Sequence, residues 1–113
     1  MFKKGYGDWT QYRKLPQAIE VDFHYSDFGP REVPYDEAMD AVWTTAFEAI
    51  QKAYNQGVQY VIFRHGWSTS RRGNTTTRSQ IRKLMRSRDA TPYIRRSACI
   101  QHESVFVAAI RPS

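Results

Sequence analysis

The chain has 113 residues, of which 41% are hydrophobic and 14% are aromatic. These values exclude a disordered chain, and the length fits one domain. The longest apolar run, residues 105–110, is far shorter than the roughly 20 residues of a membrane span, so we expect no membrane partner. The single cysteine, Cys99, excludes a disulfide framework and a thiolate metal cluster, and it fits a reducing cytoplasm.

The net charge of +6 is unevenly distributed along the chain. Residues 1–63 carry six basic and nine acidic side chains, whereas residues 64–113 carry eleven basic and two acidic ones. All but one of those eleven are arginines, whose planar guanidinium group pairs with phosphate. This predicts an anionic polymer as the partner, and a solvated basic surface without such a partner is the alternative.

The first segment, residues 1–17, mixes Gly, Lys and aromatic residues without a clear period and predicts an N-terminal extension. The domain proper is then expected over residues 18–113. Residues 18–24 alternate between apolar and polar side chains, which predicts a half-buried strand. Residues 25–34 contain two prolines and a glycine and predict an exposed loop.

A long helix is predicted over residues 35–56, where apolar side chains recur at spacings of three and four. Acidic residues in its first turn and Gly57 after its end agree with the polarity of a helix. The β-branched and aromatic run of residues 58–63 predicts a second strand. Residues 67–76 are rich in Ser, Thr, Gly, Asn and Arg and predict a loop.

A second helix is predicted from Thr77 to about Ser87, with its apolar positions toward the core. Three arginines at a spacing of four form a solvent-facing stripe on this helix: Arg78, Arg82 and Arg86. Residues 94–101 and 105–111 predict two further strands joined by a short turn.

The predicted order is therefore β-α-β-α-β-β. A strand–helix–strand unit places its strands parallel, and a final hairpin adds an antiparallel strand, so the four-stranded sheet is mixed. Two helices suffice to cover one face, which gives a two-layer α/β sandwich whose other face is partly open.

Candidate catalytic residues lie at the ends of the first two predicted strands: Asp22, His24 and His65. Ligands gather beyond the carboxyl ends of parallel strands, so His24 and His65 are expected near a shared ligand. A histidine can act as general acid or base on a phosphodiester, and a neighbouring carboxylate such as Asp22 orients the ring. The alternatives are a solvated strand face for Asp22 and His24, and a turn-stabilising hydrogen bond for His65.

The nucleic-acid-binding candidates are Arg64, Gly66, Trp67, Arg71, Arg72, Arg78, Arg82 and Arg86. The arginines would neutralise phosphate charge, and Trp67 would stack on a base. This chemistry requires no cofactor. A divalent metal such as magnesium is the alternative, since two histidines and a carboxylate are common ligands.

Three of these features together resemble the Smr domain, the small MutS-related family of nucleases, over residues 18–111. The strand-end sequence IEVDFH is similar to the LDLHG of the family, and YVIFRHG is similar to its strand leading into HGxGxG. The helix opened by Glu37-Ala38 is the third feature, and the last two strands also match in order and position. Two departures are Tyr25 in place of a glycine and WSTSRRGN where a Gly-rich turn is usual.

The resemblance implies a fold similar to the C-terminal domain of translation initiation factor three, and endonuclease activity on RNA or structured DNA. It ties Asp22 and His24 to cleavage and aligns His65 and Gly66 with the second motif. Some members of the family act on stalled ribosomes. We therefore expect an RNA endonuclease that uses His24 and Asp22, and the alternative is a non-catalytic module that binds RNA or the ribosome through the basic surface of residues 64–96. A protein-interaction domain is the third reading.

Overall fold

The computed structural model describes residues 2–23, 35–65 and 77–112, which form one mixed sheet with helices on both sides. In chain order the elements are β1 (Lys3–Lys4), η1 (Trp9–Lys14), β2 (Ala18–Asp22), α1 (Tyr35–Gln56), β3 (Tyr60–Arg64), α2 (Thr77–Arg86), η2 (Arg96–Ala98), β4 (Ile100–Gln101) and β5 (Val105–Ala109). The predicted mixed α/β class is confirmed. The predicted strand count is wrong, because five strands pair within the described residues.

The long helix α1 has the predicted bounds. Its buried side chains also follow the predicted spacing. Val42, Ala46 and Ile50 lie four residues apart on one face, and each is fully buried. Gly57 follows the helix with a φ of +72°, the left-handed conformation that closes many helices and that glycine adopts most readily.

The strand order is β1-β4-β5-β3-β2. The predicted parallel pairing of β2 with β3 is confirmed, as is the antiparallel hairpin of β4 and β5. The antiparallel pairing of β5 with β3 joins the two halves of the sheet. The parallel register places the carboxyl-terminal ends of β2 and β3 next to each other at one end of the strands.

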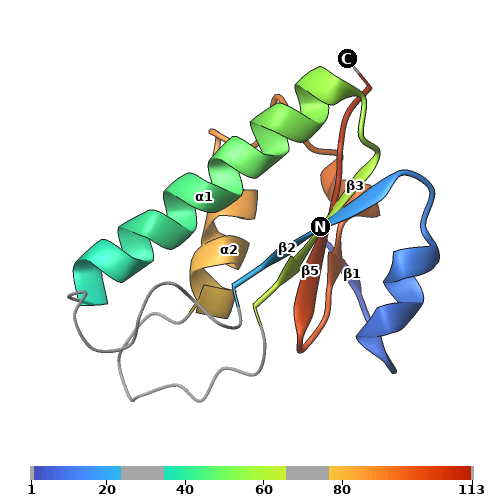
Figure 1. Cartoon of the computed structure of the whole chain (residues 1–113), viewed down its shortest axis with the longest axis horizontal. Helices are drawn as coiled ribbons and strands as arrows, with labels where there is room; N and C mark the ends of the chain where they lie inside the picture. Colours follow the sequence, from blue (N-terminus) through green and yellow to red (C-terminus); the bar gives the residue numbers. More distant parts are fainter. Residues whose placement is uncertain (1, 24–34, 66–76, 113) are drawn as a thin grey trace.

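Both α-helices cover the same face of the sheet, as predicted (Figure 1). The other face was predicted to be partly open, and it is covered in part: Glu20 and Asp22 of β2 lie on it and are exposed. The 3-10 helix η1 lies on that side (Figure 1), where Tyr12 packs with Ile62, Val105 and Val107 in a second apolar cluster. The three aliphatic side chains of this cluster have no exposed surface.

Residues 1–17, predicted to be an N-terminal extension, contain the edge strand β1 and the helix η1, which covers the second apolar cluster. Strand β1 pairs in parallel with β4, and the ring of Phe2 packs edge-on against Phe106 with centroids 5.0 Å apart. At the start of η1, Asp8 Oδ1 accepts a hydrogen bond of 3.0 Å from the backbone N–H of Thr10. A two-residue strand of exposed lysines has no apolar alternation by which sequence alone could have shown it.

The strand predicted over residues 94–101 is mostly absent, since β4 holds only its last two residues and Ile94 forms an isolated bridge with Ile110. Between them lies the 3-10 helix η2, so these residues add no strand pairing. The Arg96 guanidinium donates hydrogen bonds to the carbonyl oxygens of Met85 and Ser87 at the end of α2. Those carbonyl groups have no partner inside the helix, and binding them holds the segment against α2.

Candidate nucleic-acid interface

The two strand ends that carry the predicted catalytic motifs lie side by side. In the parallel register of β2 and β3, Asp22 pairs with Arg64. The ladder continues one residue further, since the N–H of Phe23 donates to the carbonyl oxygen of Arg64 at 2.8 Å. The expected juxtaposition of the strand ends is therefore confirmed.

At this edge the side chains of Asp22 and Arg64 form an ion pair, with Oδ2 and Nη1 3.6 Å apart. The guanidinium group of Arg64 also lies over the ring of Trp9, 4.9 Å from its centroid. A second guanidinium, that of Arg13, lies 4.6 Å from the same ring centroid. The Asp22 ion pair and the cation–π contact with Trp9 both favour this orientation of the Arg64 guanidinium.

His65 follows directly after β3 and is buried, with 6% of its surface exposed. It adjoins Arg64 in the chain and so lies at the predicted strand end. Five other predicted site residues lie outside the described residues: His24, Gly66, Trp67, Arg71 and Arg72. The structure thus brings together Asp22, Arg64 and the backbone that leads into His65.

The arginine stripe of α2 is present, but its members differ in their surroundings. The expectation of a uniformly solvent-facing stripe is wrong for Arg82, which is half-buried and donates from Nη2 to the carbonyl oxygen of His102 at 3.1 Å. Burial lowers the pKa of Arg82, and the charges of Arg78 and Arg86 lower it further. Arg86 is exposed, and its Nη2 donates to the Oε1 of Gln101 over 3.5 Å.

The sequence did not show that the N-terminal strand continues this basic surface. In the register of β1 with β4, Lys4 lies opposite Gln101, which is the partner of Arg86. The exposed ring of Tyr6, with 71% of its surface accessible, lies 5.8 Å from Lys4 Nζ. An exposed aromatic ring beside a lysine is the arrangement that stacks on an unpaired base while the cation meets a phosphate.

A small pocket of about 260 Å³ lies between α2 and the sheet edge, lined by Phe2, Arg86, Arg96 and Gln101. Arg96 is held in place by hydrogen bonds from Nε to Met85 O at 2.8 Å and from Nη1 to Thr91 Oγ1 at 2.9 Å. A guanidinium group that is already fixed loses little further side-chain freedom when it binds a phosphate.

We call Lys4, Arg78, Arg82, Arg86 and Arg96 the α2–β1 basic face. Residues 64–113 contain only two acidic side chains, Asp89 and Glu103, to offset these charges. Arginine and lysine stay charged at neutral pH, so this face can bind phosphate and neutralise its charge. Proton transfer would instead require the histidines.

Comparisons of the chain with known proteins found no match. No protein-family model matches it, and neither a curated protein nor a solved structure matches it.

Two further findings concern the described part of the chain. It contains no group of three or more His, Cys, Asp or Glu side chains that could hold a metal ion. None of its helices is long and apolar enough to cross a membrane. The magnesium alternative involves His24, which lies outside the described residues.

Proposed function

We propose that this chain binds RNA, with the α2–β1 basic face holding the phosphate backbone. The observation that carries the proposal is the convergence of cations from distant parts of the chain. Lys4 on β1, Arg86 on α2 and Arg96 on η2 come together around Gln101 and one small pocket. Clustered cations supply most of the affinity of a protein for a nucleic-acid backbone.

Single-stranded RNA is the preferred ligand, because Tyr6 and Phe2 place aromatic rings beside the cations. Tyr6 is largely exposed, and Phe2 lines the pocket with Arg86 and Arg96. Unpaired bases stack on such rings without strict sequence preference. Ribosomal RNA is one source of such strands, and a cytoplasmic location belongs to this proposal.

The binding test is a salt series of fluorescence anisotropy with labelled single-stranded RNA. For a single strand the slope of log K against log salt changes by about 0.7 for each phosphate contact that is lost. Arg86→Gln should therefore weaken binding and make the slope about 0.7 less steep. Lys52→Gln is the matched control, since it removes one exposed positive charge from α1. Equal slopes for the wild type and Arg86→Gln would overturn the assignment of this face.

A second candidate function is cleavage of the bound RNA, and the paired ends of β2 and β3 favour it. Asp22 and Arg64 meet there in register, and His24 follows Asp22 by two residues. In RNA the 2′-hydroxyl would attack the adjacent phosphorus, form a 2′,3′-cyclic phosphate and release a 5′-hydroxyl. His24 would take the proton of the 2′-hydroxyl and deliver a proton to the leaving 5′ oxygen. Asp22 would orient the imidazole of His24, and Arg64 would stabilise the negative charge of the transition state.

The cleavage test uses end-labelled single-stranded RNA, hairpin RNA and branched DNA, each with magnesium and with chelator. The proposal expects RNA cleavage that survives chelator and is lost in His24→Ala, with RNA binding retained. Cleavage that His24→Ala leaves unchanged would overturn this mechanism. Salt-sensitive binding with no cleavage would leave the chain as a binding module, and negligible affinity at physiological salt would favour a protein-interaction domain.

A further inference from the structure

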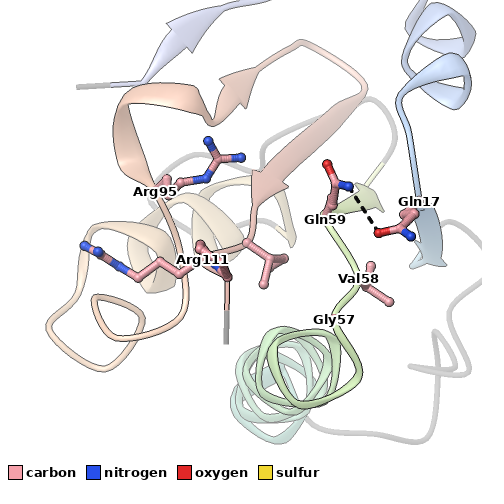
Figure 2. A pocket seen from close by; sticks show the side chains of 8 residues that line it. Gln17, Gly57, Val58, Gln59, Arg95 and Arg111 are labelled. Atoms are coloured by element: carbon pink, nitrogen blue, oxygen red, sulfur yellow. Dashed lines mark hydrogen bonds between the residues drawn. The ribbon is translucent and has the colours of Figure 1, made fainter.

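A second and larger pocket, of about 510 Å³, lies at the other end of the parallel strands. It is bounded by Gln17 before β2, by Val58 and Gln59 before β3, and by Ile110 after β5 (Figure 2). Its volume is within the range of small-molecule sites, about 300–1,000 Å³. It shares no lining residue with the α2–β1 basic face.

The backbone around this pocket is fixed by hydrogen bonds between segments far apart in the chain. The N–H of Ile110 donates to the carbonyl oxygen of Gln59 at 2.9 Å, and the N–H of Gln59 donates to that of Gln17 at 3.2 Å. On the far side, the N–H of Arg95 donates to Ala109 O at 2.8 Å. The walls are therefore preformed, and a ligand need not order them.

Gln17 has an unusual backbone conformation for its residue type. Its φ is +51°, and no other non-glycine residue in the described part of the chain has a positive φ. This left-handed conformation costs a side-chain-bearing residue energy that glycine would not lose, and such outliers cluster at binding sites. Here the conformation accompanies the contact of the Gln17 side chain with its neighbour in the pocket.

That neighbour is Gln59, whose Nε2 donates to Gln17 Oε1 at 3.2 Å (Figure 2). A bond between two amides engages one N–H and one carbonyl oxygen. The N–H groups of Gln17 and the carbonyl oxygen of Gln59 stay outside this bond. The pair therefore offers both a donor and an acceptor, which is the combination that recognises the edge of a nucleobase.

The rest of the lining is cationic and apolar. Arg95 lies across the hollow from the amide pair (Figure 2), is exposed, and pairs with no carboxylate among the described residues. Arg111 stands on the same rim, with its Nε donating to the carbonyl oxygen of Thr91 at 3.0 Å. Among the described residues that line the pocket none is acidic, and Val58 and Ile110 supply an apolar wall.

We propose that this pocket binds a nucleoside monophosphate, with its phosphate on Arg95 and its base edge on the amide pair of Gln17 and Gln59. An anion, a planar group with donors and acceptors, and an apolar body match the three parts of the lining. The ligand is either a free nucleotide or the phosphorylated end of a strand. The site is independent of the proposed RNA-binding face, since neither uses a residue of the other.

The test is a chemical-shift titration of the isotope-labelled full chain with adenosine and uridine monophosphates, with adenosine, and with inorganic phosphate. The backbone signals of Gln17, Gln59 and Arg95 should shift with the nucleotides. Inorganic phosphate and adenosine should each bind at least about tenfold more weakly, since each lacks one part of the ligand. No shift at these residues up to millimolar nucleotide, or equal affinity for phosphate alone, would overturn the proposal.

Two variants separate binding from folding. Gln17→Gly removes one amide while easing the positive φ, so it should fold and lose nucleotide affinity. Arg95→Gln should weaken nucleotide binding about tenfold. Arg88→Gln, an exposed arginine outside the lining, is the matched control and should bind normally. Unchanged affinity in both pocket variants would also overturn the proposal.

A final arm distinguishes the two sources of the ligand. Oligonucleotides with and without a 5′-phosphate are compared with the mononucleotide in the wild type and in Arg86→Gln. Tighter pocket binding of the phosphorylated strand than of the mononucleotide identifies a strand end, and the reverse identifies a free nucleotide. Arg86 lies outside the pocket. Chemical shifts caused by the nucleotide that persist in Arg86→Gln therefore show that the pocket binds nucleotide independently of the α2–β1 basic face, so the two proposals can fail separately.

Discussion

The imidazole Nε2 of His102 lies 2.6 Å from the carbonyl oxygen of Gly7, a residue 95 positions earlier in the chain. The other ring nitrogen, Nδ1, accepts a hydrogen bond of 3.0 Å from the N–H of Ser104. An accepting Nδ1 leaves Nε2 as the nitrogen that carries hydrogen and donates to Gly7. The ring of Tyr12 packs edge-on against the same imidazole. His102 thus attaches the N-terminal segment to the turn between β4 and β5.

His102→Leu should detach this segment without unfolding the helical side of the sheet. The change leaves the carbonyl of Gly7 and the N–H of Ser104 without their partner, which costs about 1–3 kcal/mol. Urea unfolding should show this loss, and hydrogen exchange should accelerate in residues 3–12 more than in α1. Glu103→Gln, at the exposed neighbouring position, is the control and should leave both measurements unchanged.

Gly5→Ala should loosen the same segment by crowding. A methyl group on Gly5 would lie 2.5 Å from Tyr12 Oη and 2.8 Å from Ile100 Cγ2, well inside van der Waals contact. Overpacking of this kind costs about 1–3 kcal/mol. The comparison is Gly57→Ala, where the added methyl meets nothing within 4 Å and only the positive φ is penalised. Only Gly5→Ala should raise exchange selectively in residues 3–12, and a uniform effect in both variants would contradict this account.

Cys99 should be unreactive in the folded chain. Burial raises the pKa of its thiol above the usual 9.0, and contacts to Arg95 O and to the N–H of Ala109 enclose the sulfur. Alkylation by iodoacetamide at pH 8 should be slow until urea unfolds the chain, because the thiolate is the reactive form. Rapid labelling in native conditions would contradict the burial of this side chain.

The same shift makes stability depend on alkaline pH. A thiol whose pKa is raised by folding contributes stability that is complete below its unfolded value near 9.0 and is lost as pH rises toward the folded value. The free energy of unfolding of the wild type should therefore fall above about pH 9 more steeply than that of Cys99→Ala. Parallel profiles would show that Cys99 does not titrate with folding. Tyr12, whose pKa burial also raises, is common to both proteins.

Asp8 should give the acid side of the stability profile a small dependence on pH. Its carboxylate accepts hydrogen bonds from the backbone and side chain of Thr10, which lower its pKa below 3.8. That contribution is present above pH 3.8 and is lost as pH falls through the lowered value. Asp8→Asn keeps an accepting oxygen but does not titrate. The thermal midpoint of this variant should therefore change less between pH 4 and pH 2 than that of the wild type. Identical pH profiles of the two midpoints would contradict the cap.

The elements that could be predicted from the sequence are those whose side-chain pattern continues over several residues. The apolar residues of α1 recur with the helical period, and β3 is a continuous β-branched and aromatic run whose central residues are all buried. Strand β1 and helix η2 depend instead on partners far along the chain, Lys3 on Ile100 and Arg96 on Met85. No local pattern encodes such contacts.

The same limit applies to the candidate sites. Arg78, Arg82 and Arg86 were found from their spacing, whereas Lys4 and Arg96 enter the basic face only through sheet pairing and the end of α2. The pocket of Gln17 and Gln59 has no sequence signal beyond two ordinary polar residues that each precede a strand.

The pairing of β1 with β4 also sets an order for folding during synthesis. A ribosome adds roughly 5–20 residues per second, so Lys3 leaves it several seconds before Ile100 does. During that interval β1 lacks its partner strand β4. Long-range pairing of this kind slows folding, so the β1–β4 contact should be among the last to form as the chain emerges.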